Sequence, residues 1–163
     1  MALPKIYTHS RGKAGITLVE ILIVIALFAF VGGSALIISM DSYRGFSFRN
    51  ERDVIISALQ KARSQAINNM CFGASCTDGK AHGLHVASPN LTLFQGGSYS
   101  VADPLNEVIS ANNNSAVLSG LTDVVFAQLS GDVASPGTIT VTDTSLHTSS
   151  ITINSEGRIT WTN

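Results

Sequence analysis

Proline is almost missing from the first half of the chain. The sequence holds four prolines, and none of them lies between Pro4 and Pro89. Proline interrupts a helix because it lacks a backbone donor and clashes with the preceding turn. Its absence here permits one uninterrupted helix over about residues 16–68, which is the helix that we expect.

Charge is also scarce at the start of this region. Between Ile16 and Met40, Glu20 is the single ionisable residue, which leaves 24 uncharged residues. About 20 apolar residues are enough for a helix to cross a bilayer. The segment is apolar on all sides, whereas a helix in a protein core is usually one-sided. We therefore expect residues 16–40 to form a transmembrane or filament-core helix.

The sequence signatures of common enzymes are absent as well. There is no G-x-S-x-G elbow, no phosphate-binding loop and no zinc-type ligand spacing. His82 and His85 are three residues apart, and on a strand this spacing directs them to opposite faces, so we expect ordinary surface or half-buried histidines. We expect no enzyme, no metal and no cofactor. A hydrolase tethered by an uncleaved anchor is the disfavoured alternative.

Cysteine is limited to Cys71 and Cys76. Two cysteines without a second ligand pair are too few for a structural metal site. If this region lies outside the cytoplasm, a short-loop disulfide is expected, and its stabilisation would be roughly 2 kcal/mol by the chain-entropy formula. Two free thiols are the alternative.

Charges of the two signs are separated along the chain. Residues 1–15 contain Lys5, Arg11 and Lys13 and no acid. From Asn69 to the end, seven acidic residues face two basic ones, a net charge of −5. Because basic flanks stay in the cytoplasm, we expect residues 69–163 to lie outside it as a head domain. A weaker alternative is that the basic start and the apolar segment form an ordinary secretory signal, which would be cut within residues 32–35.

Glu20 is the feature that needs most explanation. A carboxylate within an apolar helix costs about 2.5–3.5 kcal/mol near the bilayer centre and less near its edge, and such a residue is by default a functional hypothesis. The nearest plausible cation is a free α-amine at Ile16, which would exist if the chain were cut after Gly15. Such a cut would also remove the basic residues of the leader.

The run from Gly15 to Glu20 resembles the prepilin signal of type IV pilins and type II secretion pseudopilins. The resemblance implies that residues 1–15 are a leader, that prepilin peptidase cuts between Gly15 and Ile16, and that Ile16 is then N-methylated. It also implies that Glu20 pairs with the N-terminal amine of a neighbouring subunit. Two features depart from the family, because the first mature residue is usually Phe, and many major pilins have a proline later in this helix.

Beyond Met40 the pattern becomes amphipathic and then alternating. Residues 41–68 place apolar side chains on one face, as expected of the second half of the helix. The region after Asn68 alternates with a period of two, as antiparallel strands do. Within Asn154–Gly157 we expect a hairpin turn, with Gly157 at positive φ. The expected fold is α+β and pilin-like, with the helix packed on an antiparallel sheet or sandwich. The expected strands are 83–87, 91–95, 99–101, 108–110, 116–119, 124–129, 138–142, 150–154 and 158–161.

Three segments of the mature chain resemble the GspH/FimT-type minor pseudopilins. These are residues 57–66, Val125–Phe126 with Gly131, and residues 151–159. The resemblance implies two antiparallel sheets on the helix and a minor subunit near a filament tip. Expected partners are prepilin peptidase, other pilin or pseudopilin subunits, the inner-membrane assembly platform and the membrane. The expected location is the inner membrane as a single-pass protein, and then the filament. The filament is a type II secretion pseudopilus or, alternatively, a type IV pilus.

Some FimT-like relatives take up DNA through a basic C-terminal motif, in which Gly-Arg is followed by a further Arg. Here Gly157-Arg158 is followed by Thr160 in the place of that second arginine. A head of net charge −5 also repels phosphates, whose neutralisation supplies most non-specific affinity. Nucleic acid is therefore a disfavoured partner, and Arg158 is expected to be structural and to pair with a nearby acid.

Overall fold

The computed structural model describes residues 15–74, 76–110 and 116–162, with only the backbone described for residues 35–44. The expected leader, apart from Gly15, lies outside the described residues, as do the side chains at the end of the expected transmembrane segment. The chain divides into two units, Met1–Ser42 and Tyr43–Asn163.

The long helix predicted from the proline-free region is confirmed. Helix α1 runs from Leu18 to Ile67 over 50 residues. It ends where Asn69 takes a left-handed conformation, with φ at 56°. The N–H of Asn69 donates to the carbonyl of Ala66, and the N–H of Met70 donates to that of Gln65. This pair of bonds satisfies the last carbonyls of the helix and turns the chain away.

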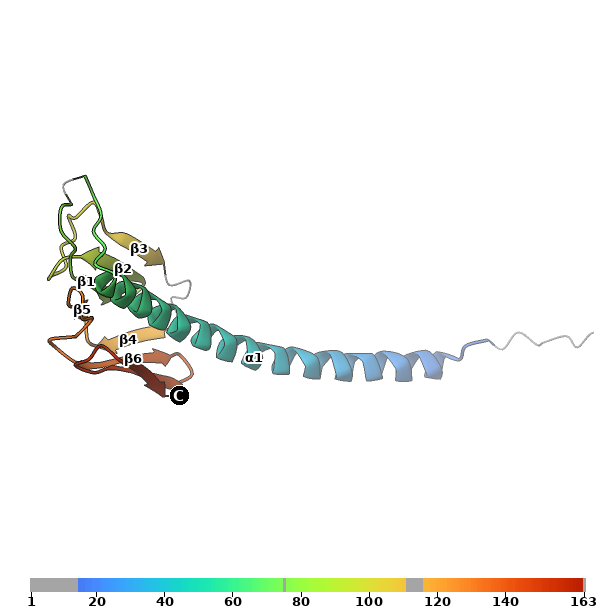
Figure 1. Cartoon of the computed structure of the whole chain (residues 1–163). Coiled ribbons are helices and arrows are strands. Elements are labelled where there is room, and N and C mark those ends of the chain that lie inside the picture. The colour runs from blue at the N-terminus through green and yellow to red at the C-terminus, as the bar shows by residue number, and fades with distance from the viewer. Residues whose placement is uncertain (1–14, 75, 111–115, 163) are drawn as a thin grey trace, which may run out of the picture. The chain divides into compact units, whose positions relative to one another are not determined.

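Two four-stranded antiparallel sheets follow the helix (Figure 1). The first has the order β3-β2-β1-β5 and the second the order β4-β6-β7-β8. The strands are β1 (His82–Ala87), β2 (Asn90–Gln95), β3 (Glu107–Ser110), β4 (Ala116–Gly120), β5 (Asp123–Phe126), β6 (Gly137–Asp143), β7 (Thr148–Ile153) and β8 (Ile159–Thr162).

The core of residues 43–163 lies between these sheets and the second half of α1. The helix buries Ile55, Leu59, Ala62 and Ala66 at a spacing of three or four residues, which defines one helical face. The sheets meet this face with alternate residues of their strands, as the period of two requires. These are Leu84, Val86, Leu91, Leu93, Val124, Phe126, Ile139, Val141, Ile151 and Ile153. The predicted α+β fold, a helix packed against antiparallel sheets, is confirmed.

Parts of the strand prediction are wrong. The expected strand 124–129 ends at Phe126, and Leu129 takes a left-handed conformation with φ at 68°. Residues 99–101 form no strand, because the ring of Tyr99 instead stacks on that of His85, with centroids 3.9 Å apart. Trp161, which alternates with Ile159 in the last expected strand, is 47% exposed. It lies on β8, which is the last strand in its sheet, so a neighbouring strand covers it on one side only.

Candidate functional site

The expected cleavage site lies just outside the long helix. Gly15 and Ile16 have irregular backbone and are exposed, and α1 begins two residues later at Leu18. A peptidase must bind its substrate in an extended form, and backbone that is already hydrogen-bonded in a helix is not available for this. The peptide bond between these two residues is therefore open to an enzyme.

Thr17 caps the beginning of α1. Its Oγ1 accepts a hydrogen bond from the N–H of Glu20 at 3.3 Å, and its carbonyl accepts one from the N–H of Ile21 at 3.3 Å. Threonine at the N-cap with glutamate three residues later is the pattern of a capping box. The prediction from sequence missed this role of Thr17, although the T-x-x-E spacing signals it.

The side chain of Glu20 is exposed in the first turn of α1. Among the described residues, no hydrogen bond or ion pair involves its carboxylate. A negative charge at a helix N-terminus interacts favourably with the helix dipole. The carboxylate is thus placed next to the expected cleavage site and is available to a cation from outside this part of the chain.

Apolar side chains around Glu20 are uncovered on every side of the helix. Between residues 16 and 31, the large apolar side chains are 43–78% exposed. They are Ile16, Leu18, Val19, Ile21, Leu22, Ile23, Val24, Ile25, Leu27, Phe28, Phe30 and Val31. A contiguous exposed apolar surface of this kind marks an interaction with lipid or protein. Among the described residues, no helix is both long and apolar enough to cross a membrane.

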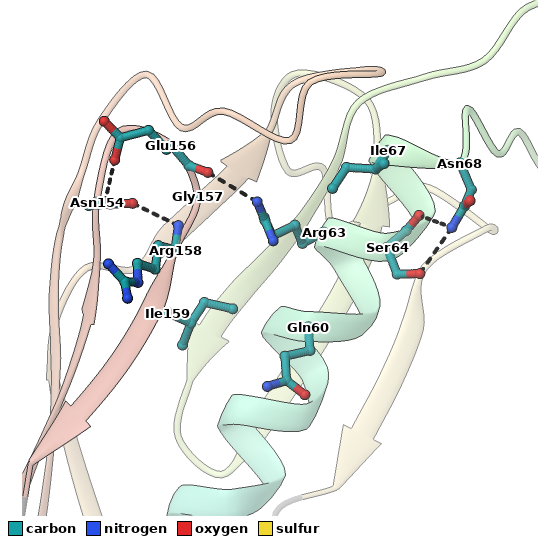
Figure 2. A pocket seen from close by; sticks show the side chains of 10 residues that line it. All are labelled: Gln60, Arg63, Ser64, Ile67, Asn68, Asn154, Glu156, Gly157, Arg158 and Ile159. Carbon is teal, nitrogen blue, oxygen red and sulfur yellow. Dashed lines mark hydrogen bonds between the residues drawn. The ribbon is translucent and has the colours of Figure 1, made fainter.

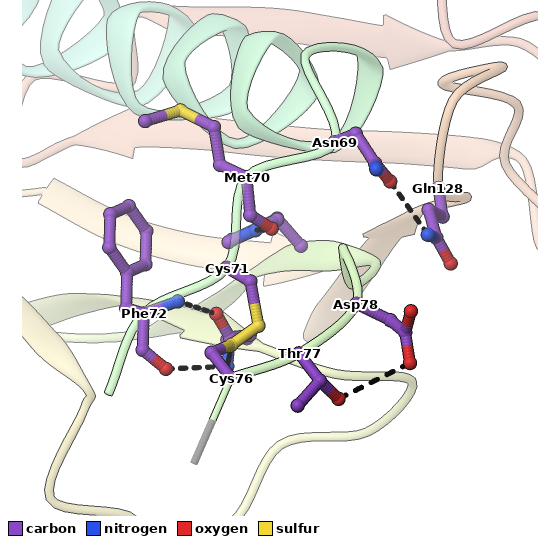
Figure 3. The surroundings of a disulfide bond; sticks show 10 residues. Asn69, Met70, Cys71, Phe72, Cys76, Thr77, Asp78 and Gln128 are labelled. Atoms are coloured by element: carbon purple, nitrogen blue, oxygen red, sulfur yellow. Dashed lines mark hydrogen bonds between the residues drawn. A yellow bond between two sulfur atoms is a disulfide. The ribbon is translucent and has the colours of Figure 1, made fainter. Parts of the chain in front are cut away.

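The two cysteines form a disulfide directly after α1 (Figure 3). The Cα atoms of Cys71 and Cys76 are 5.8 Å apart, within the usual range for such a bond. The side chain of Gln95 holds the loop, because its Oε1 accepts from the N–H of Phe72 at 2.6 Å and its Nε2 donates to the Phe72 carbonyl at 3.4 Å. The loop is thereby fixed to strand β2.

The histidines have separate structural roles. His82 is 1% exposed, so the expectation of a surface or half-buried residue is wrong for it. It is buried because its Nε2 lies 2.9 Å from the Met70 carbonyl and its ring packs edge-on against Phe72. His85 is half-buried, with Nδ1 2.8 Å from Asp123 Oδ1. Within the described residues, no group of three or more His, Cys, Asp or Glu side chains is arranged to hold a metal.

The turn between β7 and β8 is locked to α1 (Figure 2). Arg63 Nη2 donates to the carbonyl of Glu156 at 3.2 Å. Gly157 has φ at 67°, which confirms the predicted positive φ. A Cβ added there would lie 2.0 Å from the Gly131 carbonyl oxygen and 3.0 Å from Arg63 Nε. Only glycine fits this position. The close approach to Gly131 therefore explains the glycine of the Gly157-Arg158 pair.

Arg158 does not show the predicted pairing with an acid. Its backbone N–H donates to Asn154 Oδ1 at 2.7 Å, which closes the turn. Among the described residues, its guanidinium takes part in no ion pair. The nearest acid in sequence is Glu156, and this carboxylate instead accepts a hydrogen bond from the Asn154 amide. The guanidinium therefore remains free for a ligand.

Two carboxyl groups of the same unit have perturbed pKa values. Glu51 is 4% exposed, its Oε2 has no hydrogen-bond partner, and burial raises the pKa of this carboxyl. Burial alone would also raise the pKa of Asp143, but hydrogen bonds from the His147 ring and from the backbone N–H groups of His147 and Ser145 lower that pKa below its usual value. Asp143 thus orders the β6–β7 turn, whose His147 contacts Phe48 of α1.

Comparison with protein families identifies the N-terminal segment. Residues 10–36 match the family model of the prokaryotic N-terminal methylation motif. The match spans the expected cleavage site, Glu20 and most of the apolar run, and it supports a type IV pilin-like protein. Proteins of this kind are structural, and their motif implies processing by prepilin peptidase. Neither the curated proteins nor the solved structures gave a match.

Proposed function

We propose that this chain is a minor pseudopilin that assembles into a type II secretion pseudopilus. The observation that carries this proposal is the methylation motif at residues 10–36, on a helix whose apolar side chains are uncovered and whose first turn bears a free carboxylate. A minor type IV pilin of the FimT kind is the alternative, supported by the same motif. The role is structural in both cases.

The mechanism begins with cleavage between Gly15 and Ile16. The cut removes the basic leader and creates an α-amine at Ile16, which the enzyme then methylates. The processed subunit is held by residues 16–40 in the inner membrane, with the acidic head outside the cytoplasm. This pool of subunits feeds the assembly platform.

Assembly then rests on apolar packing and on one charge pair. Helices of neighbouring subunits cover the exposed apolar side chains of residues 16–31. The carboxylate of Glu20 meets the Ile16 amine of a neighbour. An unpaired charge in an apolar environment is costly, so a subunit out of register loses this pairing. The pair therefore selects the register of the filament.

The test expresses the full chain together with prepilin peptidase and the filament components. Mass spectrometry of the mature chain should find Ile16 as a methylated N-terminus. Glu20→Ala should be inserted and cleaved normally but enter sheared filaments poorly, whereas Ser34→Ala in the same segment should behave as the parent. Normal incorporation of Glu20→Ala would refute the pairing, and a chain that begins elsewhere would refute the processing. Deletion of the gene distinguishes the two filaments, since it should impair protein export in one case and pilus functions in the other.

A further inference from the structure

A groove lies between the last turns of α1 and the β7–β8 turn (Figure 2). Its volume is about 790 Å³, which is within the usual range for ligand sites. One wall is formed by α1, including Gln60 and Arg63, and the other by Gly157, Arg158 and Ile159. All of these residues belong to the unit Tyr43–Asn163.

Arg63 and Arg158 are the two cationic residues among those that line this groove. Arg63 donates one hydrogen bond, from Nη2 to the Glu156 carbonyl. Its Nη1 has no partner among the described residues. Arg158 uses only its backbone N–H, as described above. The one acid in the lining, Glu156, has its carboxylate bonded to the Asn154 amide. Figure 2 shows Arg63 reaching from the helix toward the turn, and the guanidinium of Arg158 on the side of the turn that faces away from α1. A ligand would therefore meet one cation between α1 and the turn and the other on the far side of the turn.

Ile159, which lines the groove, is also the first residue of an edge strand. Strand β8 is the last of its sheet in the described part of the chain. The N–H of Asn154 donates to the carbonyl of Arg158 at 3.1 Å, which makes these two a hydrogen-bonded pair. Such pairs alternate along an antiparallel ladder. The peptide groups of Ile159 and Trp161 therefore face away from β7, where an added strand can pair with them.

We propose that this groove binds an extended acidic segment of a partner protein. The segment adds as a strand to the free edge of β8, and its aspartate or glutamate side chains bind Arg63 and Arg158. Main-chain pairing gives affinity in this mode of recognition, and side-chain contacts give specificity. Guanidinium and carboxylate groups match because they form paired, charge-assisted hydrogen bonds.

A peptide fits this groove better than a nucleic acid does. Binding of a phosphate backbone depends on the neutralisation of many phosphates, and the unit that holds the groove, Tyr43–Asn163, carries a net charge of −2. Two guanidinium groups suffice for one or two carboxylates. A phosphodiester backbone also has no N–H donors, so it cannot form the alternating donor and acceptor pairs of a strand edge.

The test uses the full chain in detergent micelles and its single tryptophan as the reporter. Trp161 lies on β8 and is about half exposed, so a strand added at this edge should shift its emission to shorter wavelength. The probe is a blocked hexapeptide of valine with two adjacent aspartates, because successive side chains of a strand point to opposite faces and can reach Arg63 and Arg158 separately. Matched peptides replace aspartate with asparagine or with lysine. The acidic peptide should shift the emission saturably, and both replacements should bind at least about tenfold more weakly, because they lose the charge-assisted bonds.

Two further comparisons locate the site. Arg158→Glu should lower the affinity for the acidic peptide by at least about tenfold. Lys80→Glu changes the net charge by the same amount outside the groove, and its affinity should stay within about twofold of that of the parent. In an added strand, alternate N–H groups of the probe peptide point toward β8 and the others point away from it. N-methylation of the first set should therefore abolish binding, and N-methylation of the second set should be tolerated.

The outcomes separate this proposal from the filament function. Absence of a saturable shift with the acidic peptide, or equal losses in Arg158→Glu and Lys80→Glu, would overturn it. Tighter binding of a short single-stranded DNA than of the peptide would assign the groove to nucleic acid instead. None of these measurements depends on cleavage at Gly15 or on assembly.

Discussion

Substitution of Gly157 by alanine probes the lock between α1 and the last hairpin. The residue has a φ of 67°, and an added Cβ would lie 2.0 Å from the carbonyl oxygen of Gly131. That oxygen belongs to the backbone, so no side-chain rotation relieves the overlap. The turn must move away from α1, and the hydrogen bond from Arg63 to the Glu156 carbonyl is then weakened or lost.

The magnitude follows from two terms. A left-handed conformation costs a non-glycine residue about 1–2 kcal/mol. Overpacking against fixed neighbours typically costs a further 1–3 kcal/mol. We therefore expect Gly157→Ala to lower the free energy of unfolding by about 3 kcal/mol. For a domain slightly larger than 100 residues, this corresponds to a fall in the unfolding temperature of about 10 °C.

Thermal unfolding followed by circular dichroism at the β-sheet minimum measures this effect. Gly97→Ala is the matched control, since nothing lies within 4 Å of a Cβ added at Gly97 and its φ is not in the left-handed region. The control should unfold within about 2 °C of the parent, as surface substitutions usually do. If Gly157→Ala also unfolded at the parental temperature, the close approach to Gly131 would be unimportant and the structural explanation of this glycine would be wrong.

Three further changes test other parts of the unit Tyr43–Asn163. Replacement of Cys71 and Cys76 by serine should cost roughly 2 kcal/mol by the loop-entropy relation, and reduction of the parent should reproduce this loss in chemical denaturation. Burial raises the pKa of Glu51. The contribution of this side chain to stability is therefore fully present below its ordinary pKa, and it is lost as the pH rises through the raised pKa. Glu51→Gln should therefore raise the unfolding temperature at pH 7 relative to the parent and change it little at pH 4. The pKa of Asp143 is lowered, so its contribution is present above the ordinary value and falls as the pH drops through the lowered one. Asp143→Asn should be less stable than the parent at pH 7. Between pH 4 and pH 2, its unfolding temperature should change less than that of the parent. An equal change of unfolding temperature with pH in the two proteins would contradict this account.

Local features of the sequence were sufficient for the helix and most of the strands. The helix needs only an absence of proline and a continuous apolar or amphipathic pattern, and both can be read without knowledge of the fold. The hairpin at Gly157 was predictable for a similar reason, because turn chemistry is local. The capping role of Thr17 could also have been read from its spacing to Glu20.

Features that depend on distant residues could not be predicted in this way. His82 is buried because it reaches the Met70 carbonyl, twelve residues away in sequence. The close approach of Gly157 to Gly131 involves two separate loops and a side chain of α1. Residues 99–101 have a sequence typical of a strand. The ring of Tyr99 instead stacks on His85 of β1, and its backbone lies outside the sheets. In each case a tertiary contact decides the outcome.

The capping geometry at Thr17 offers a second explanation for Glu20, and the energies separate the two. An acid near a helix N-terminus stabilises the helix by about 0.3–1 kcal/mol. An acid in an apolar segment costs about 2.5–3.5 kcal/mol at the bilayer centre and less towards the edge. Among the described residues nothing neutralises this carboxylate. Glutamine can fill this third position of a capping box without a charge, so capping alone does not account for a carboxylate in this apolar run. The amine of another subunit would account for it, and this reasoning favours the proposed assembly role of Glu20 over helix capping.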